Sequence, residues 1–154
     1  MRMNLEWRWY AWRELDPDTL HDLLRLRSAA FVVEQNCVYA DMDGRDPQCE
    51  HLCVRDRSGA LLAYLRLLPP GVSGAEPSLG RLVVVREARG EGLARAIARE
   101  GIRMCQTRYP ERDIRIGAQQ HLEAFYTSVG FKVASAPYVD DGIWHVDMLL
   151  RWSR

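Results

Sequence analysis

In the middle of the chain, the spacing of hydrophobic residues changes abruptly from a continuous run to a helical repeat. Residues 82–85 are all apolar and three of them are valines, a composition typical of a buried strand. A turn containing two glycines follows, and from residue 93 to residue 105 apolar side chains recur at steps of three and four, with arginines on the opposite face. The pattern predicts a strand that leads through this turn directly into an amphipathic helix.

The rest of the chain alternates between short apolar or aromatic runs and helical spacing. Asp16 followed by Pro17 is a typical helix start, because aspartate caps the first turn and proline fits its first position. Gly130 suits the end of the last helix. We expect strands at about 5–12, 50–55, 61–68, 82–85, 114–117, 132–134 and 143–152, and helices at about 17–33, 93–108 and 120–129.

This order of elements indicates the fold class. It requires few crossovers, which favours a mixed sheet with helices on both faces. The 154 residues are enough to bury one full core, so we expect a single domain over residues 1–154. The expected fold is α/β (α+β), with a mixed central β-sheet of about seven strands flanked by helices on both faces.

Charge and composition exclude several classes of function. Basic residues number 21 and acidic residues also number 21, so no overall field attracts nucleic acid. No apolar run approaches the roughly 18 residues of a membrane span, and charged residues interrupt the first segment, so neither a membrane anchor nor a signal peptide is expected. We therefore expect a cytoplasmic protein with reduced cysteines and with neither a nucleic-acid nor a membrane partner.

Two groups of residues invite a metal interpretation, and both fit poorly. Cys49, His51 and Cys53 would share one face of a strand, but their spacing matches no common zinc site, and small buried thiols explain the cysteines better. The stretch 41–46 resembles a calcium loop in its aspartates, but Leu52 stands where such a loop has its glutamate. No metal site is expected.

The turn before the long helix has the features of an anion site. The first N–H groups of a helix have no partner inside it, and the helix dipole favours a negative charge there. Gly90 and Gly92 have no Cβ, so an anion can approach the backbone closely. The lysine of a mononucleotide P-loop is absent, and Arg95 replaces the third glycine of a dinucleotide loop. Another kind of anion, or a plain tight turn with no ligand, stays open.

Two sequence blocks extend this interpretation. The turn, Arg89-Gly90-Glu91-Gly92-Leu93-Ala94, fits the pattern Arg/Gln-x-x-Gly-x-Gly/Ala and so resembles the pyrophosphate loop of the GCN5-related N-acetyltransferases (GNAT). Tyr126, Gly130 and Phe131 keep their places in the second block of that family. Gln119 replaces its asparagine and Leu122 its alanine. The expected strands and helices also follow the order of the family, so the resemblance covers nearly the whole chain.

A narrower resemblance is to the ElaA subfamily. It rests on the segment 26–39, on Asp41 and Asp43, and on the segments 117–122 and 141–145. Val38 is a departure, because a proline is expected after Cys37. This difference affects the stiffness of the loop more than its chemistry.

The resemblance implies a cofactor and a place for it. Members of the family bind acetyl-CoA where the fourth and fifth strands separate, with its pyrophosphate on the glycine turn. A backbone N–H near Val84 would also polarise the thioester carbonyl. The residues implied in cofactor binding are Leu82, Val83, Val84, Arg89, Gly90, Glu91, Gly92, Leu93, Ala94 and Gln119.

Catalytic and acceptor-binding residues are implied in the same way. Tyr126 would protonate the departing thiolate, the alternative being a core tyrosine on an apolar stripe. The base is left open among Glu34, His51, His121 and His145, each of which also has a structural explanation. The residues implied in acceptor binding are Glu34, Tyr39, Asp41, His121 and His145.

The expected function is that of an acetyl-CoA-dependent N-acetyltransferase acting on a primary amine of a small molecule or peptide. The carboxylates of Glu34, Asp41, Asp43 and Asp46 lie close in sequence, in a loop that the family resemblance places beside the acceptor cleft. Their negative field favours a cationic amine unless they only solvate and cap their loop. Two other functions stay open: a non-catalytic module that binds and senses acyl-CoA, and an acyltransferase that uses a longer acyl-CoA. The oligomeric state is also open, a homodimer included.

Overall fold

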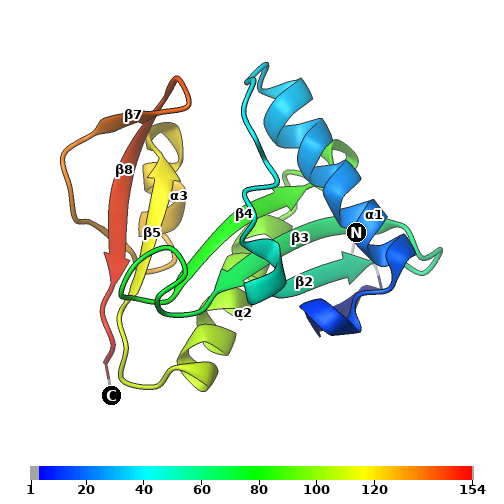
Figure 1. Cartoon of the computed structure of the whole chain (residues 1–154), viewed down its shortest axis with the longest axis horizontal. Coiled ribbons are helices and arrows are strands. Elements are labelled where there is room, and N and C mark those ends of the chain that lie inside the picture. The colour runs from blue at the N-terminus through cyan, green and yellow to red at the C-terminus, as the bar shows by residue number, and fades with distance from the viewer. Residues whose placement is uncertain (1–3, 154) are drawn as a thin grey trace.

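The strands form two sheets that diverge from each other like the arms of a V (Figure 1). The computed structural model describes residues 4–153, so residues 1–3 and 154 of the expected domain lie outside the described residues. The first sheet is antiparallel, with the order β1-β2-β3-β4. Its strands are β1 (Glu6–Ala11), β2 (Glu50–Arg55), β3 (Leu61–Leu68) and β4 (Ser78–Val84).

The second sheet is built around the last strand. One edge of β8 (Ile143–Leu150) pairs, over its residues 145–150, with the whole of β5 (Ile114–Gln119). The other edge pairs with β6 (Lys132–Val133) near the end of β8 and with β7 (Tyr138–Asp140) near its start. The chain between β5 and β6 forms the short helix α3 (Glu123–Thr127), which contacts both strands.

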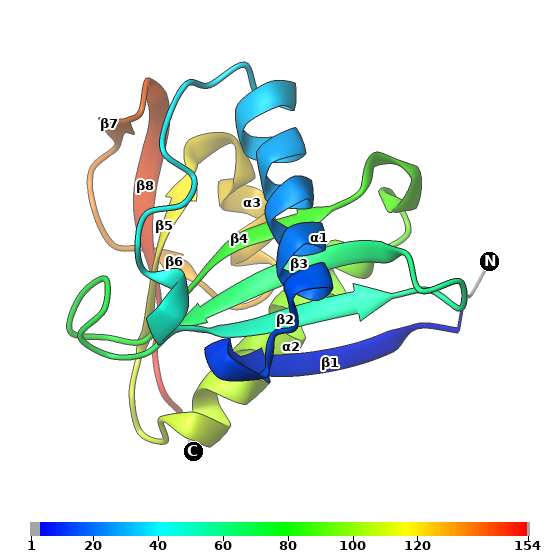
Figure 2. The same ribbon diagram turned by 45° about the vertical axis from the view of Figure 1, so that its right-hand side comes forward.

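Two helices cover opposite faces of the first sheet, α1 (Pro17–Arg27) on one and α2 (Leu93–Arg108) on the other (Figure 2). The alternation of side chains along β3 explains this arrangement. Tyr64 packs in a cluster with Leu23 of α1, while its neighbour Leu65 packs in a cluster with Ile97 of α2. Turns of 3-10 helix lie at Trp12–Glu14, Asp46–Gln48, Arg86–Ala88 and Gln120–Leu122.

The α+β fold class predicted from the sequence is confirmed, with helices on both faces. The bounds of β2 and β3 agree with those expected, and Asp16 caps α1 by accepting a hydrogen bond from the N–H of Thr19 at 2.7 Å. Residues 4–153 contain eight strands instead of about seven. The additional strand, β7, has only three residues, too few for an alternating pattern to show.

The first helix also differs from its expected form. The α-helix ends at Arg27, and the chain continues to Glu34 as a π-helical segment, Ser28–Glu34. The wider turns keep Ala30 on the buried face, so the hydrophobic pattern alone does not distinguish the two helix types. Segments of this kind are frequent at functional sites.

Strands β4 and β5 touch at one end only. The N–H of Arg115, in β5, donates to the carbonyl of Pro77, which precedes β4, at 3.1 Å. The two strands run in the same direction from this point and separate toward their carboxyl ends (Figure 1). An opening is therefore left between the sheets, beside the turn that begins α2.

A distortion of β4 lies along this opening. In the pairing with β3, Arg81 and Leu82 stand together opposite Leu65, which makes a β-bulge. Arg81 has a φ of +54°, a left-handed conformation that is unusual for a residue with a side chain. The bulge explains why only the second half of β4 shows the continuous apolar pattern of a strand.

Within residues 4–153, no helix combines the length and apolar character that crossing a membrane requires. The cysteines at positions 37, 49, 53 and 105 are all buried and none forms a disulfide.

Candidate active site

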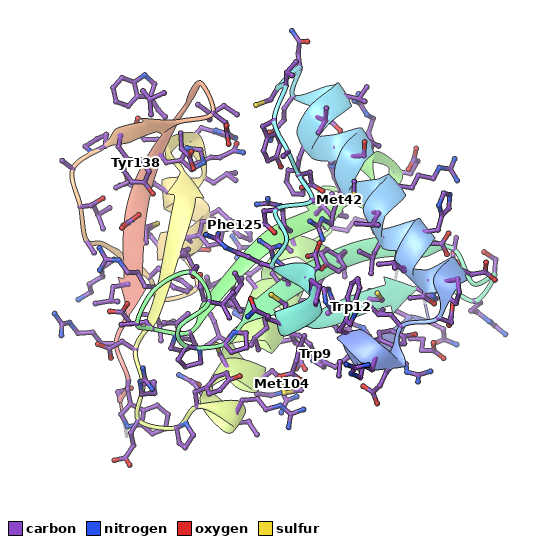
Figure 3. All side chains as sticks on the ribbon, in the orientation of Figure 1. Trp9, Trp12, Met42, Met104, Phe125 and Tyr138 are labelled. Carbon is purple, nitrogen blue, oxygen red and sulfur yellow. The ribbon has the colours of Figure 1, made fainter. Side chains whose placement is uncertain are left out.

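The opening between the two sheets contains a cavity of about 560 Å³. Its walls come from β4, β5, the end of the π-helical segment, the loop after it and the β7–β8 hairpin. Figure 3 shows Phe125 in the gap between the sheets and Tyr138 on the hairpin at its far side. Of the residues predicted in the site, the cavity is lined by Glu34, Tyr39, Leu82, Val83, Val84, Arg89, Ala94, Gln119, His121, Tyr126 and His145.

A second, smaller cavity of about 200 Å³ lies at the start of α2. Its lining includes Gly90, Gly92 and Leu93, and it shares Val84, Arg89, Ala94 and Phe125 with the larger cavity. The two cavities are therefore neighbours along β4. Glu91 is the one predicted cofactor residue that lines neither of them.

The glycine turn is shaped as an anion site requires. Gly90 and Gly92 have φ values of +85° and +83°, and a Cβ added at either would meet no atom within 4 Å. Within the described residues, the first hydrogen bond at this end of α2 is donated by Ala96 to the carbonyl of Gly92 at 3.1 Å. Among residues 4–153, no protein acceptor is found for the N–H groups of residues 93–95, at the helix end that carries the positive dipole.

The side chain of Arg89 connects the glycine turn to the end of β4, the strand that precedes it. Its Nε donates to the carbonyl of Val84 at 2.8 Å. Its two terminal nitrogens donate to the carboxylate of Glu34 at 2.7 and 3.0 Å. Arg89 therefore joins the end of β4 and the π-helical segment to the start of the glycine turn.

Tyr126 lines the larger cavity, and its ring packs edge-on against Phe125 and Phe131. Burial raises the pKa of its hydroxyl to about 12, so that the group stays protonated at neutral pH. Within residues 4–153 this hydroxyl makes no hydrogen bond to the protein. The arrangement combines a packed ring with a proton that is still available for donation into the cavity.

His145 faces the same cavity in a fixed tautomer. Its Nδ1 lies 2.8 Å from the carbonyl oxygen of Ile143, which can only accept, so Nδ1 carries the proton. Its ring stacks on that of Tyr138. With the Nδ1 proton engaged in this way, Nε2 is the ring nitrogen that is left to exchange a proton with a ligand in the cavity. His121, the other candidate histidine in the cavity wall, is exposed in the 3-10 turn Gln120–Leu122 that precedes α3.

Glu34 lines the cavity, but its carboxylate is already occupied. The hydrogen bonds from Arg89 lower the pKa of Glu34, and Arg86 adds a more distant positive charge at 3.7 Å. A carboxylate held in this way is a weak proton acceptor. The geometry supports a structural contact for Glu34 over the role of base.

His51 is not in the cavity, which removes it as a candidate base. It is fully buried between the first sheet and the turn at Asp46–Gln48. Its Nε2 donates to the carbonyl of Asp46 at 3.0 Å, and its Nδ1 accepts from the hydroxyl of Tyr64 at 2.6 Å. Burial lowers the pKa of this imidazole, so His51 is a neutral core residue with both nitrogens satisfied.

The acidic loop also differs from its expected role. Asp41 is buried, lines neither cavity, and binds Arg27 at 3.0 Å and Arg81 at 2.8 Å. Asp46 binds Arg27 at 2.8 Å and Arg66 at 3.0 Å, and both oxygens of Asp43 accept from Arg66 at 2.9 Å. Three arginines from the scaffold therefore balance the three aspartates, and the loop presents no unpaired negative patch.

Several residues that line the cavity were not identified from the sequence. Asp140 and Asp141, in the hairpin turn, have exposed carboxylates with no ion-pair partner within residues 4–153. Arg81 enters the wall through the bulge, while Gln35 and Cys37 come from the loop after the π-helical segment. The resemblance to the ElaA subfamily did include segments 26–39 and 141–145. It did not show which of their side chains line the cavity, because tertiary contacts decide that.

The side-chain chemistry of the described residues offers no metal centre. No group of three or more histidine, cysteine or acidic side chains is arranged to hold an ion within residues 4–153. Cys49 and Cys53 are buried thiols whose pKa values burial raises, to about 11 and about 12.

Comparisons with known proteins place this geometry in a family. The family model of the acetyltransferase (GNAT) domain matches residues 25–152. A UPF0039 protein of Synechocystis sp. is 40% identical over 149 residues, which cover 97% of each chain. A solved acyl-CoA N-acyltransferase from Pseudomonas aeruginosa is 35% identical with a TM-score of 0.90, covering 96% of this chain and 99% of that one. The crystal structure of ElaA from Escherichia coli is 34% identical with a TM-score of 0.88, covering 96% and 100%. This chain belongs to the GNAT acetyltransferase-domain family and is a homologue of ElaA and the UPF0039 proteins.

Proposed function

We propose that the chain transfers an acetyl group from the thioester of acetyl-CoA to a primary amine. One observation carries the proposal: the N–H groups at the start of α2, which have no protein acceptor within residues 4–153, lie beside a cavity along β4 that is lined by the Tyr126 hydroxyl and by His145, whose Nδ1 is held by a backbone carbonyl. Family membership supports an acyl-CoA as the donor.

The residues along the two cavities fit such a donor. The N–H groups of Leu93, Ala94 and Arg95 would hold the pyrophosphate, and each charge-assisted hydrogen bond is worth on the order of 1.5–3 kcal/mol. The exposed backbone edge of β4 beside the bulge would hold the pantetheine arm and polarise the carbonyl that is attacked. When bound, the donor supplies an activated acetyl group as a thioester.

The proton transfers can be assigned to two residues. Freeing an amine whose pKa is near 10.4 costs about 4.6 kcal/mol at pH 7, so help from a base is needed most. Nε2 of His145, the ring nitrogen not engaged by the backbone, would accept this proton, directly or through a water molecule. The thiolate, with a pKa near 8.5, costs only about 2 kcal/mol to accumulate, and the hydroxyl of Tyr126 would protonate it.

A screen of primary amines with acetyl-CoA, read by the release of free thiol, tests the proposal directly. Turnover of at least one amine is expected. Binding of CoA without turnover of any amine would favour the sensing module instead. Faster turnover with longer acyl-CoA thioesters than with acetyl-CoA would replace acetyl as the transferred group.

Tyr126→Phe tests the assigned acid, because it keeps the ring packing and removes only the hydroxyl. Turnover should fall at least tenfold while the affinity for CoA hardly changes. Tyr109→Phe is a matched control, since Tyr109 packs against the same core but does not line the cavity. Equal turnover in the two variants would show that the Tyr126 hydroxyl is not the acid and that its ring only packs in the core.

A further inference from the structure

Four consecutive residues, 34–37, cross the opening between the two sheets and contact both sides of it. Glu34 binds Arg89, which is itself bonded to the carbonyl of Val84 at the end of β4, and Gln35 binds Gln119 at the end of β5. Sγ of Cys37 donates to the carbonyl of Asp141 at 3.3 Å. The loop that contains them lies between the arms of the V in Figures 1 and 2. We call residues 34–37 the bridge.

On the β4 side, Glu34 binds Arg89 through both carboxylate oxygens, and Arg89 in turn binds the backbone of β4. Both terminal nitrogens of Arg89 are held by Glu34, and the remaining Nε reaches back to the carbonyl of Val84. This last hydrogen bond closes a loop of six residues, 84–89, directly before the glycine turn. Without Glu34, the guanidinium would lose two of its three contacts and the restraint on its rotation.

The contact on the β5 side is reciprocal. The amide of Gln35 donates to the oxygen of Gln119 at 3.3 Å, and the amide of Gln119 donates back at 3.2 Å. Neighbouring residues of the bridge therefore hold the two strands whose separation forms the cavity. A side chain that only solvated a loop would show no such pairing with both walls.

We propose that Glu34 and Gln35 are positioning residues for the donor channel: Glu34 acts through Arg89 on the glycine turn, and Gln35 acts through Gln119 on the opposite wall. The inference rests on the proposed function, because the channel is the one assigned to acetyl-CoA. In this role the carboxylate of Glu34 stabilises the donor site through Arg89. It neither transfers a proton nor binds the amine directly.

A double-mutant cycle on Glu34 and Arg89 tests the inference, with CoA affinity measured by calorimetry on the full chain. Glutamine stands in place of arginine in the family pattern, so Arg89→Gln is the suitable partner variant. Glu34→Gln should weaken CoA binding about three- to fivefold in the wild-type background, a size expected for a half-exposed ion pair. In the Arg89→Gln background the same change should have less than a 1.5-fold effect. Gln35→Ala and Gln119→Ala should be coupled in the same way.

Kinetics and a control separate positioning from other roles. Glu34→Gln should raise KM for acetyl-CoA and leave the pH profile of kcat unchanged, and Glu34→Asp should recover part of the loss. Glu100→Gln removes a comparable pair with Arg103 on α2, at 2.7 Å, and should leave CoA affinity unchanged.

Two results would overturn the inference. One is an equal effect of Glu34→Gln in both backgrounds, and the other is unchanged CoA affinity with a raised KM for the amine. Absence of CoA binding by the wild-type chain would overturn the proposed function itself, which the calorimetry detects independently of turnover.

Discussion

Two polar regions of this molecule differ in whether their hydrogen-bonding groups have partners within the protein. The loop 41–46 carries three aspartates, and scaffold arginines bind all of them. In the described part of this network, only Nε of Arg66 is buried without a partner. The turn and first residues of α2, 89–95, show the opposite, because residues 93–95 line the smaller cavity and their N–H groups have no acceptor in the described part of the chain.

The difference indicates what each region does. Paired charges in a protein interior contribute to the stability of one conformation, and removing one partner leaves the other uncompensated. Unpaired donors beside a cavity have a hydrogen-bonding capacity that a ligand can use. Both regions looked functional from the sequence, since each is polar and rich in charge or glycine. The comparison predicts that changes in the loop 41–46 reduce stability, whereas changes in the turn reduce binding.

The largest effect is expected from Asp46→Asn. This change leaves Arg27 and Arg66 buried with one carboxylate fewer, and we expect the free energy of unfolding to fall by about 3–5 kcal/mol. Urea denaturation measures it. Asp22→Asn is the control, because Asp22 pairs with Arg55 at 3.2 Å with 41% of its side chain exposed, and it should cost much less. Similar losses of unfolding free energy in the two variants would show that the buried network contributes no more to stability than an exposed ion pair.

Gly92→Asp should have the largest effect on binding. An aspartate at this position places bulk and a negative charge where the pyrophosphate would lie, and we expect CoA affinity to fall on the order of 100-fold. Gly59→Asp controls for backbone strain, because its φ of +87° and open surroundings match those of Gly92, with a φ of +83°. Calorimetry on both folded variants decides the matter. Unchanged affinity in Gly92→Asp would refute the assignment of the turn.

The stability of the protein should depend on pH in the acidic range. Burial alone would raise the pKa values of Asp43 and Asp46, but the hydrogen bonds and charges of Arg27, Arg66 and Arg81 outweigh it and lower them. The stabilisation is therefore complete above the unfolded-state pKa of about 3.9 and is lost as the pH falls below it. Thermal melts between pH 6 and pH 3 should show a falling Tm below about pH 4. The fall should be shallower in Asp46→Asn and unchanged in Gly92→Asp, and an equal slope in all three would argue against the network as its source.

The smallest effect concerns the attraction of a cationic amine. Asp141 lines the cavity with no ion-pair partner within residues 4–153, whereas Asp41 is bound by two arginines, so of these two carboxylates Asp141 is the one expected to contribute a field at the acceptor end. Asp141→Asn should raise KM for the best amine about two- to threefold at low salt and flatten its salt dependence. Asparagine also tolerates the φ of +48° at this position. If Asp41→Asn raised KM more than Asp141→Asn, the loop 41–46 would again be the region that recognises the amine.

Much of the fold followed from local pattern. β2 and β3 have their expected bounds, and α2 begins at residue 93, directly after a left-handed Gly92. Nine of the ten residues implied in cofactor binding line one of the two cavities, Glu91 being the exception. The π-helical segment, the bulge at Arg81 and the three-residue β7 were missed, because each is a local irregularity that neither helical nor alternating spacing reveals.

The sequence by itself determined most of the segments that form strands and helices, where the glycine turn proposed to bind an anion lies, and to which family the chain belongs, because these depend on neighbouring residues and on short motifs. Only the tertiary structure decided which polar side chains are available. Asp41 and Arg81 are 40 residues apart, and Glu34 and Arg89 are 55 apart. His51 differs from His145 only in what the fold packs around it. Ion pairs and burial act through space, so a motif can identify a candidate carboxylate or imidazole, while the fold decides whether its charge and lone pairs are already engaged.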